Sequence, residues 1–193
     1  MNILTDALPD FVAVGNVKYK VNTDFRIWME FERVIQNTDT SAKDKVMMIL
    51  RLCLDSERLK ALPEDVLSIM GALKKFYLRD KENKATTAKK QDRALDFAED
   101  SGYIYSAFLT QYGIDLLSIP YMHWYVFCAL LEGLEETREF VKIMRFRVCD
   151  PDKEHNTEKR KYLKRMKEFY ALADLRSESE KEEDIAKVLL EVF

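Results

Sequence analysis

An unusually apolar stretch near the middle of the chain restricts the possible folds more than any other feature. Residues 119–133 read IPYMHWYVFCALLEG and contain eleven apolar side chains. A helix of about fourteen residues is only about 21 Å long, whereas the hydrocarbon core of a bilayer is about 30 Å thick. A short helix that is apolar on almost every side belongs inside a protein. We therefore predict that residues 119–132 form the central helix of a globular fold.

The ends of this helix and the histidine within it need separate interpretations. Ser118 is the expected N-cap, Pro120 falls in the first turn and Gly133 follows the last turn. His123 lies between them, directly before Trp124. A single histidine in an apolar helix is more often a structural residue, hydrogen-bonded through one ring nitrogen, than a ligand or a catalyst. We interpret His123 as structural.

Few residues in this chain favour turns. The 193 residues include only five glycines and four prolines, a composition that favours long helices over many short strands. We predict a mainly α fold, a single helical domain of about seven to eight helices. Apolar residues at helical spacing predict helices over residues 24–36, 41–54, 63–79, 98–112, 119–132, 135–148, 156–173 and 179–192. Ser41 and Asp44 have the spacing of a capping box at the start of the second helix.

The N-terminal residues 10–22 show a different pattern. Two short apolar runs flank Gly15 and Asn16, which suit a two-residue turn. Alternation on the second run places Val17, Tyr19 and Val21 on one face. This segment is predicted to be a small β-hairpin, and it must pack on the helices because an isolated hairpin is only marginally stable.

Two segments stand apart from the predicted helical core of residues 1–150. Residues 80–93 include no large apolar side chain, so they cannot contribute to a core and are predicted to form a flexible loop. Residues 151–193 are rich in charge and are predicted to form C-terminal helices that are a candidate for a mobile, partner-binding extension.

The end of the chain carries the candidate partner-binding residues. They are Ile185, Val188, Leu189, Val192 and Phe193. The first four have the i, i+3, i+4, i+7 spacing of an apolar helix face, and an acidic run precedes them. This face either packs on the protein's own domain or lies in the groove of a partner, and the sequence leaves both possibilities open.

The sequence offers little support for an enzyme, a cofactor or a metal. His123 and His155 lie more than thirty residues apart, and no cysteine near them has the spacing of a zinc site. Motifs for phosphate cradles and nucleophile elbows are absent from the sequence. We therefore expect a protein that is not an enzyme, with no catalytic, cofactor-binding or metal-binding residues.

Charge and cysteine content restrict the partners and the compartment. The net charge of −3 gives no general attraction for a polyanion, and Glu154, Glu158 and Glu168 lie on either side of the basic run at residues 159–167, so nucleic acid is an unlikely partner. Cys53, Cys128 and Cys149 are widely separated in apolar patterns and suit a reducing compartment. The N-terminus does not resemble a secretory signal. We expect a cytoplasmic protein with no membrane partner.

Two motifs resemble a known family. The run DFAEDSGYIYSAFLTQYGIDL at residues 96–116, then MHWYVFCALLEGL at residues 122–134, then a helix with Arg147 near its end, resemble the bacteriophage gene product fifteen family of tailed phages and prophages of Gram-positive bacteria. The residues that carry the motif are Tyr112, Asp115, His123, Trp124, Phe127, Leu131, Gly133 and Arg147. The resemblance extends from about residue 10 to residue 150 and implies that these residues define the structural core. Tyr125 stands where a second tryptophan is expected.

The resemblance also implies a function. Family members are encoded near the tape-measure gene and look like tail-assembly chaperones, which coat the tape-measure protein without catalysing a reaction. The expected partners are the tape-measure protein, other tail proteins and further copies of this chain, in the host bacterial cytoplasm. A minor tail or tail-completion protein that stays in the virion is the first alternative, and a nucleic-acid-binding module is a more distant one.

Overall fold

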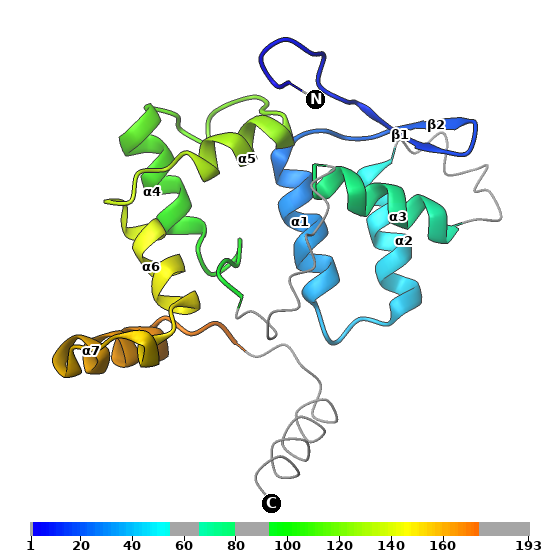
Figure 1. Ribbon diagram of the computed structural model, residues 1–193. Coiled ribbons are helices and arrows are strands. Elements are labelled where there is room, and N and C mark those ends of the chain that lie inside the picture. Colours follow the sequence, from blue (N-terminus) through cyan, green and yellow to red (C-terminus); the bar gives the residue numbers. More distant parts are fainter. Residues whose placement is uncertain (1, 55–65, 80–92, 174–193) are drawn as a thin grey trace, which may run out of the picture.

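The computed structural model describes residues 2–54, 66–79 and 93–173 (Figure 1). These residues form a two-stranded sheet, seven α-helices and one short 3-10 helix. The prediction of a mainly α fold with an N-terminal hairpin is therefore confirmed. None of the helices in the described ranges is both long enough and apolar enough to cross a bilayer. The predicted loop at 80–93, apart from Arg93, and the predicted helix at 179–192 lie outside the described residues.

The hairpin consists of β1 (Phe11–Val14) and β2 (Val17–Lys20), which pair antiparallel with Val14 opposite Val17. Gly15 starts the two-residue turn with a φ of +57°, a conformation that glycine adopts without strain. The hairpin packs on α3 (Val66–Tyr77). Tyr19 and Val21 are buried in the core, but Val17 is 52% exposed because it lies beside the turn, at the end of the predicted apolar face.

The first three helices match their predicted spans closely. The helix α1 (Phe25–Gln36) begins after Asp24, whose side chain accepts a hydrogen bond from the Arg26 N–H. The helix α2 (Ala42–Cys53) has the predicted N-cap, because the Asp44 N–H donates to Ser41 Oγ at 3.2 Å. The Ser41 hydroxyl in turn donates to the Asp44 carboxylate at 2.6 Å. The predicted start of α3, at residue 63, lies outside the described residues.

The next three helices all begin later than predicted. They are α4 (Ser101–Tyr112), α5 (Trp124–Glu132) and α6 (Glu139–Val148), with predicted starts at 98, 119 and 135. The largest error is at α5, where Ser118 is not the N-cap and His123 is. The Phe25 N–H donates to the Met122 carbonyl at 2.9 Å, and the Trp124 N–H donates to the Thr23 carbonyl at 2.7 Å. These bonds to a distant segment hold the residues before Trp124 in an extended conformation.

The last described elements are the 3-10 helix η2 (Pro151–Lys153) and α7 (Thr157–Phe169), which begins after the N-cap Asn156. This helix ends four residues before the predicted residue 173. It packs against α6, yet none of its residues is buried, and Phe169 is 74% exposed. This helix therefore lies on the surface of the described structure, attached to α6.

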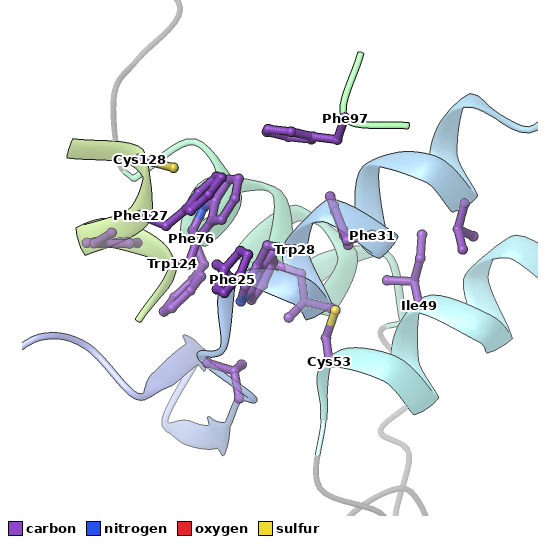
Figure 2. Close-up of a cluster of buried hydrophobic side chains, with 14 of the residues drawn as sticks. Phe25, Trp28, Phe31, Ile49, Cys53, Phe76, Phe97, Trp124, Phe127 and Cys128 are labelled. Carbon is purple, nitrogen blue, oxygen red and sulfur yellow. The ribbon is translucent and has the colours of Figure 1, made fainter. Parts of the chain in front are cut away.

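Aromatic rings from α1, α3 and α5, together with Phe97, form the centre of the core (Figure 2). The Phe127 ring stacks on Phe25 with centroids 4.7 Å apart and on Phe108 with centroids 5.2 Å apart. Trp124 is 2% exposed, and its indole N–H donates to the Tyr77 carbonyl at 2.9 Å. Burial of such rings is the main source of stability in a core. Despite its late start, α5 occupies the central position expected of the apolar stretch.

Candidate protein-binding groove

An apolar cavity of about 570 Å³ opens beside α1. One wall is a face of α1, and the other consists of residues 96–105 and 116–117. The apolar residues that line it are Phe25, Met29, Phe97, Ile104, Leu116 and Leu117. Charged groups of both signs lie among them, from Arg26, Arg33, Glu30, Glu32 and Asp96. An apolar depression of this size with a charged margin is typical of a binding site.

The α1 wall arises from a helix with two useful faces. Phe25, Trp28, Phe31 and Val34 are buried in the core. Met29 and Arg33 lie on the adjoining face, four residues apart, and line the cavity. Residues at this spacing share one side of a helix. The same twelve-residue helix therefore anchors the core and supplies one side of the groove.

The turn after α4 builds the opposite wall. The Asp115 carboxylate accepts a hydrogen bond from the Leu117 N–H at 3.0 Å, and this bond lowers the pKa of Asp115. The Arg26 guanidinium donates to the Leu116 carbonyl at 2.9 Å and to the Ile119 carbonyl at 2.8 Å. The turn is thus attached to the start of α1, with Leu116 only 7% exposed and Leu117 81% exposed.

Asp115 itself is not in the hydrophobic core. The family resemblance places this residue among the core-defining positions, but its side chain is only half-buried. The expectation is corrected on that point, because a carboxylate that caps a turn needs backbone N–H groups rather than an apolar environment. Its contribution is to shape the wall that carries Leu117.

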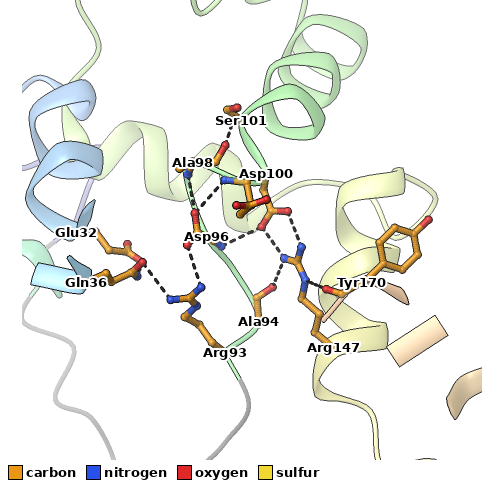
Figure 3. Close-up of polar contacts among 11 residues, drawn as sticks. Glu32, Gln36, Arg93, Ala94, Asp96, Ala98, Asp100, Ser101, Arg147 and Tyr170 are labelled. Atoms are coloured by element: carbon orange, nitrogen blue, oxygen red, sulfur yellow. Dashed lines mark hydrogen bonds and ion pairs between the residues drawn. The ribbon is translucent and has the colours of Figure 1, made fainter. Parts of the chain in front are cut away.

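A polar network closes the far end of the groove (Figure 3). The Tyr77 hydroxyl donates to Glu32, and Gln36 donates to the same carboxylate at 2.6 Å. Arg93 donates to Gln36 at 3.2 Å and pairs with Asp96 at 3.0 Å. Burial raises the pKa of Glu32 and, together with the nearby Glu32 charge, that of Tyr77. The network fixes the distance between α1 and the segment that leads into α4.

A buried ion pair holds that same segment from the other side (Figure 3). Arg147 of α6 donates to both Asp100 oxygens at 2.6 and 2.9 Å, while Asp100 is 0% and Arg147 6% exposed. The guanidinium also donates to the Ala94 carbonyl at 3.0 Å and to the Tyr170 carbonyl at 2.7 Å. This bidentate arrangement joins α4, α6 and the end of α7.

His123 serves as a helix cap. Its Nδ1 accepts a hydrogen bond from the Tyr125 N–H at 3.0 Å, so Nε2 carries the proton and donates to the Pro9 carbonyl at 3.0 Å. Both ring nitrogens therefore form hydrogen bonds, whereas the sequence led us to expect only one to do so. Burial lowers the pKa of His123, which keeps the ring neutral so that Nδ1 remains an acceptor.

The remaining motif residues fix the end of α5. The Tyr112 hydroxyl donates to the Leu130 carbonyl at 2.8 Å. A Cβ on Gly133 would lie 3.2 Å from that hydroxyl and 3.3 Å from the Ala129 carbonyl, so the close approach favours glycine. Gly133 is exposed, whereas Leu131 and Tyr112 are half-buried against the core. These three residues therefore surround the core, while Trp124 and Phe127 lie inside it.

The structure tests some expected interaction sites but not others. Ile185, Val188, Leu189, Val192 and Phe193 lie outside the described residues. In the basic run, Lys159, Lys161 and Lys164 pair with Glu154, Glu158 and Asp152. No sequence signal marks Arg26 or Asp96 as part of a groove. Asp100 precedes a helix as a cap would, yet it makes no side-chain cap bond there and binds Arg147 instead.

Comparison with known proteins agrees with the resemblance seen in the sequence. The family model described as Bacteriophage Gp15 protein matches residues 4–172. No curated protein and no solved structure matches the chain. The match includes both walls of the groove and the Arg147–Asp100 pair. The chain is a phage protein and belongs to the bacteriophage Gp15 family.

Proposed function

We propose that this protein is a non-enzymatic tail-assembly chaperone that binds the tape-measure protein in the host cytoplasm. A tape-measure protein is a long helical chain whose apolar stripes would aggregate before the tail encloses them. A chaperone for such a client needs an apolar surface that can hold helices, on a body that remains charged elsewhere. The family match is consistent with this role but does not specify the client.

The groove is the observation that carries the proposal. Its walls combine a fixed apolar floor, formed by Phe25 and Phe97, with the projecting side chain of Leu117. An amphipathic helix places apolar residues in such a groove and leaves its polar face in water. The nearby Arg33 and Glu30 side chains can contact the charged flanks of that helix. We assign the groove as the surface that holds apolar helical segments of the client.

The basic face of α7 gives less support to nucleic-acid binding. Three of its lysines pair with carboxylates, and Lys167 donates to the Cys149 carbonyl at 2.9 Å. Strong binding to nucleic acid depends on cations that contact phosphates and release counterions. Lysines that already have acidic neighbours are less effective in this role.

The test is co-expression of the protein with the tape-measure protein of its own genome. The expected result is a soluble client that elutes with this protein on size exclusion. Leu117→Glu should reduce the recovered complex at least tenfold, because a charge then enters the apolar groove. Leu67→Glu is the matched control, since Leu67 is 82% exposed on α3, outside the groove, and it should leave recovery unchanged.

Three results would contradict the proposal or its assignment to the groove. A client that stays insoluble, or is soluble but elutes separately, would show that the family match does not extend to this function. Mass spectrometry that finds the protein in purified virions in stoichiometric amounts would favour a minor tail or tail-completion protein instead. Equal loss of recovery with Leu117→Glu and Leu67→Glu would show that the groove does not bind the client.

A further inference from the structure

The described chain ends close to the groove. The Tyr170 carbonyl accepts a hydrogen bond from Arg147, which also binds Asp100 and the Ala94 carbonyl. Asp100 Oδ2 accepts a hydrogen bond from the Asp96 N–H at 2.9 Å, and Asp96 lines the groove. A short series of direct contacts therefore connects the end of α7 to the groove wall. The chain continues for twenty residues beyond Ala173.

We propose that residues 179–193 of this same chain occupy the groove when no client is bound. This proposal adopts, of the two alternatives for the C-terminal apolar face, the one in which it packs on its own domain. The occupant would place Ile185, Val188, Leu189 and Val192 against the apolar lining. The inference concerns the protein alone, so it extends the proposed function without depending on it.

The length of the connection permits this docking. Residues 174–178 connect Ala173 to the predicted helix start at 179, and an extended chain covers about 3.3–3.6 Å per residue, so these six steps can span about 20 Å. Docking within one chain also has a high effective concentration, of the order of millimolar for short connections. A segment with only modest intrinsic affinity would therefore occupy the groove for most of the time.

The chemistry of the segment matches that of the groove. Four apolar side chains at i, i+3, i+4 and i+7 make one continuous face of a helix. The floor of the groove, formed by Phe25 and Phe97, is also apolar. The groove margin carries charges of both signs, and its two arginines already have acidic partners, because Arg33 pairs with Glu30 and Arg26 pairs with Asp24 at 3.1 Å. The match therefore depends on the apolar face and not on charge.

A regulatory consequence follows from this arrangement. A client helix must displace the segment, so the apparent affinity for the client is reduced in proportion to the fraction of protein with an open groove. The groove is also covered before a client is available, which limits self-association through exposed apolar surface.

The experiment is photo-crosslinking within the purified full-length protein, with no client present. Leu189→p-benzoylphenylalanine places a photoreactive group on the apolar face, and Lys187→p-benzoylphenylalanine places it on the opposite face as a control. After irradiation at low protein concentration, mass spectrometry of tryptic peptides should locate Leu189 crosslinks on residues 27–33 or 94–138 within a single chain. The yield should be at least fivefold higher than from position 187.

A second substitution distinguishes groove docking from general proximity. Leu117→Glu in the Leu189 crosslinking background should reduce the yield at least threefold, whereas Leu67→Glu should leave it unchanged. Crosslinks between chains, with a yield that rises with concentration, would overturn the proposal and identify a second copy as the occupant. Crosslinks to other surfaces, or a yield no higher than from position 187, would also overturn it. Because no client is present, failure here is separate from failure of the co-expression test.

Discussion

The helices α5 and α7 contribute to the molecule in opposite ways. The nine residues of α5 include four buried ones, whereas none of the thirteen residues of α7 is buried. Stacking of Phe127 on Phe25 and Phe108, stacking of Trp124 on Tyr77 and the Trp124 indole bond hold α5 in the core. The Arg147–Tyr170 bond, the Lys167–Cys149 bond and the stacking of Phe146 on Tyr170 hold the end of α7. Stability is therefore concentrated at α5, and α7 depends on a few attachments.

The sharpest test of this contrast compares one aromatic residue from each helix. Trp124→Ala should lower the free energy of unfolding by about 3–5 kcal/mol, because it removes a large buried ring and leaves a cavity. Phe169→Ala should change it by less than about 0.5 kcal/mol, as is usual for exposed side chains. Urea titration followed by circular dichroism measures both values. Equal losses would contradict the placement of α5 at the centre.

The Arg147–Asp100 pair should be an exception to this contrast, because a residue outside α5 is expected to matter as much for stability as Trp124. Arg147→Ala should cost about 3–5 kcal/mol, because it leaves the Asp100 carboxylate buried without a partner. The double variant Arg147→Met with Asp100→Leu should lose less than the single variant, since no unpaired charge remains. A double-variant loss larger than that of Arg147→Ala would contradict the importance of charge compensation here. Urea titration of the three proteins provides the comparison.

The His123 cap should have an intermediate effect that depends on pH. His123→Ala should cost about 1 kcal/mol at pH 8, the usual value for a lost N-cap. The folded pKa lies below the ordinary value of 6.5, so the unfolded chain takes up a proton first as the solution is acidified. The part of the stability due to His123 is therefore complete above about pH 6.5 and falls as the pH drops toward the folded pKa.

The pH dependence can be assigned to His123 by difference. Between pH 8 and pH 5 the natural protein should lose more stability than the His123→Ala variant, when both are measured by urea titration at each pH. Identical pH profiles for the natural protein and His123→Ala would contradict protonation of the cap.

The smallest stability effect is expected at the groove. Leu117→Glu should change the free energy of unfolding by no more than about 0.5 kcal/mol, because the side chain is 81% exposed. Thermal melts of this variant and of Leu67→Glu should therefore agree to within about 3 °C. A large destabilisation by Leu117→Glu alone would show that Leu117 is part of the core, and binding losses in that variant would then have no simple interpretation.

Local sequence patterns predict the kinds of element well and their starts less well. The hairpin at 10–22 and the helix at 24–36 depend on nearby signals, namely a turn at Gly15 and a cap at Asp24, and the structure has both. The start of α5 depends on backbone bonds between Thr23, Phe25 and the segment before Trp124. No local pattern encodes such pairing across about a hundred residues, so the proline at 120 wrongly suggested a helix start.

The groove could be predicted only in part for the same reason. The family motif includes Asp115, but nothing near Arg26 in sequence indicates that its guanidinium binds the carbonyls of Leu116 and Ile119. The aromatic residues of α7 also have helical spacing, yet Phe169 contacts the adjacent Tyr170 and remains mostly in solvent, because spacing alone does not show whether a second surface is available to cover an apolar face.

Hydrogen exchange of the Leu189→Glu variant, in which the C-terminal segment should leave the groove open, with and without its soluble tape-measure complex, tests the central claim most directly. If the groove holds the client, amide exchange should slow in peptides from residues 26–37, 96–105 and 115–119, while peptides from α7 exchange at unchanged rates. Slower exchange confined to α7, or unchanged exchange along both walls of the groove in a complex that is demonstrably formed, would contradict the assignment of the groove as the client-binding surface.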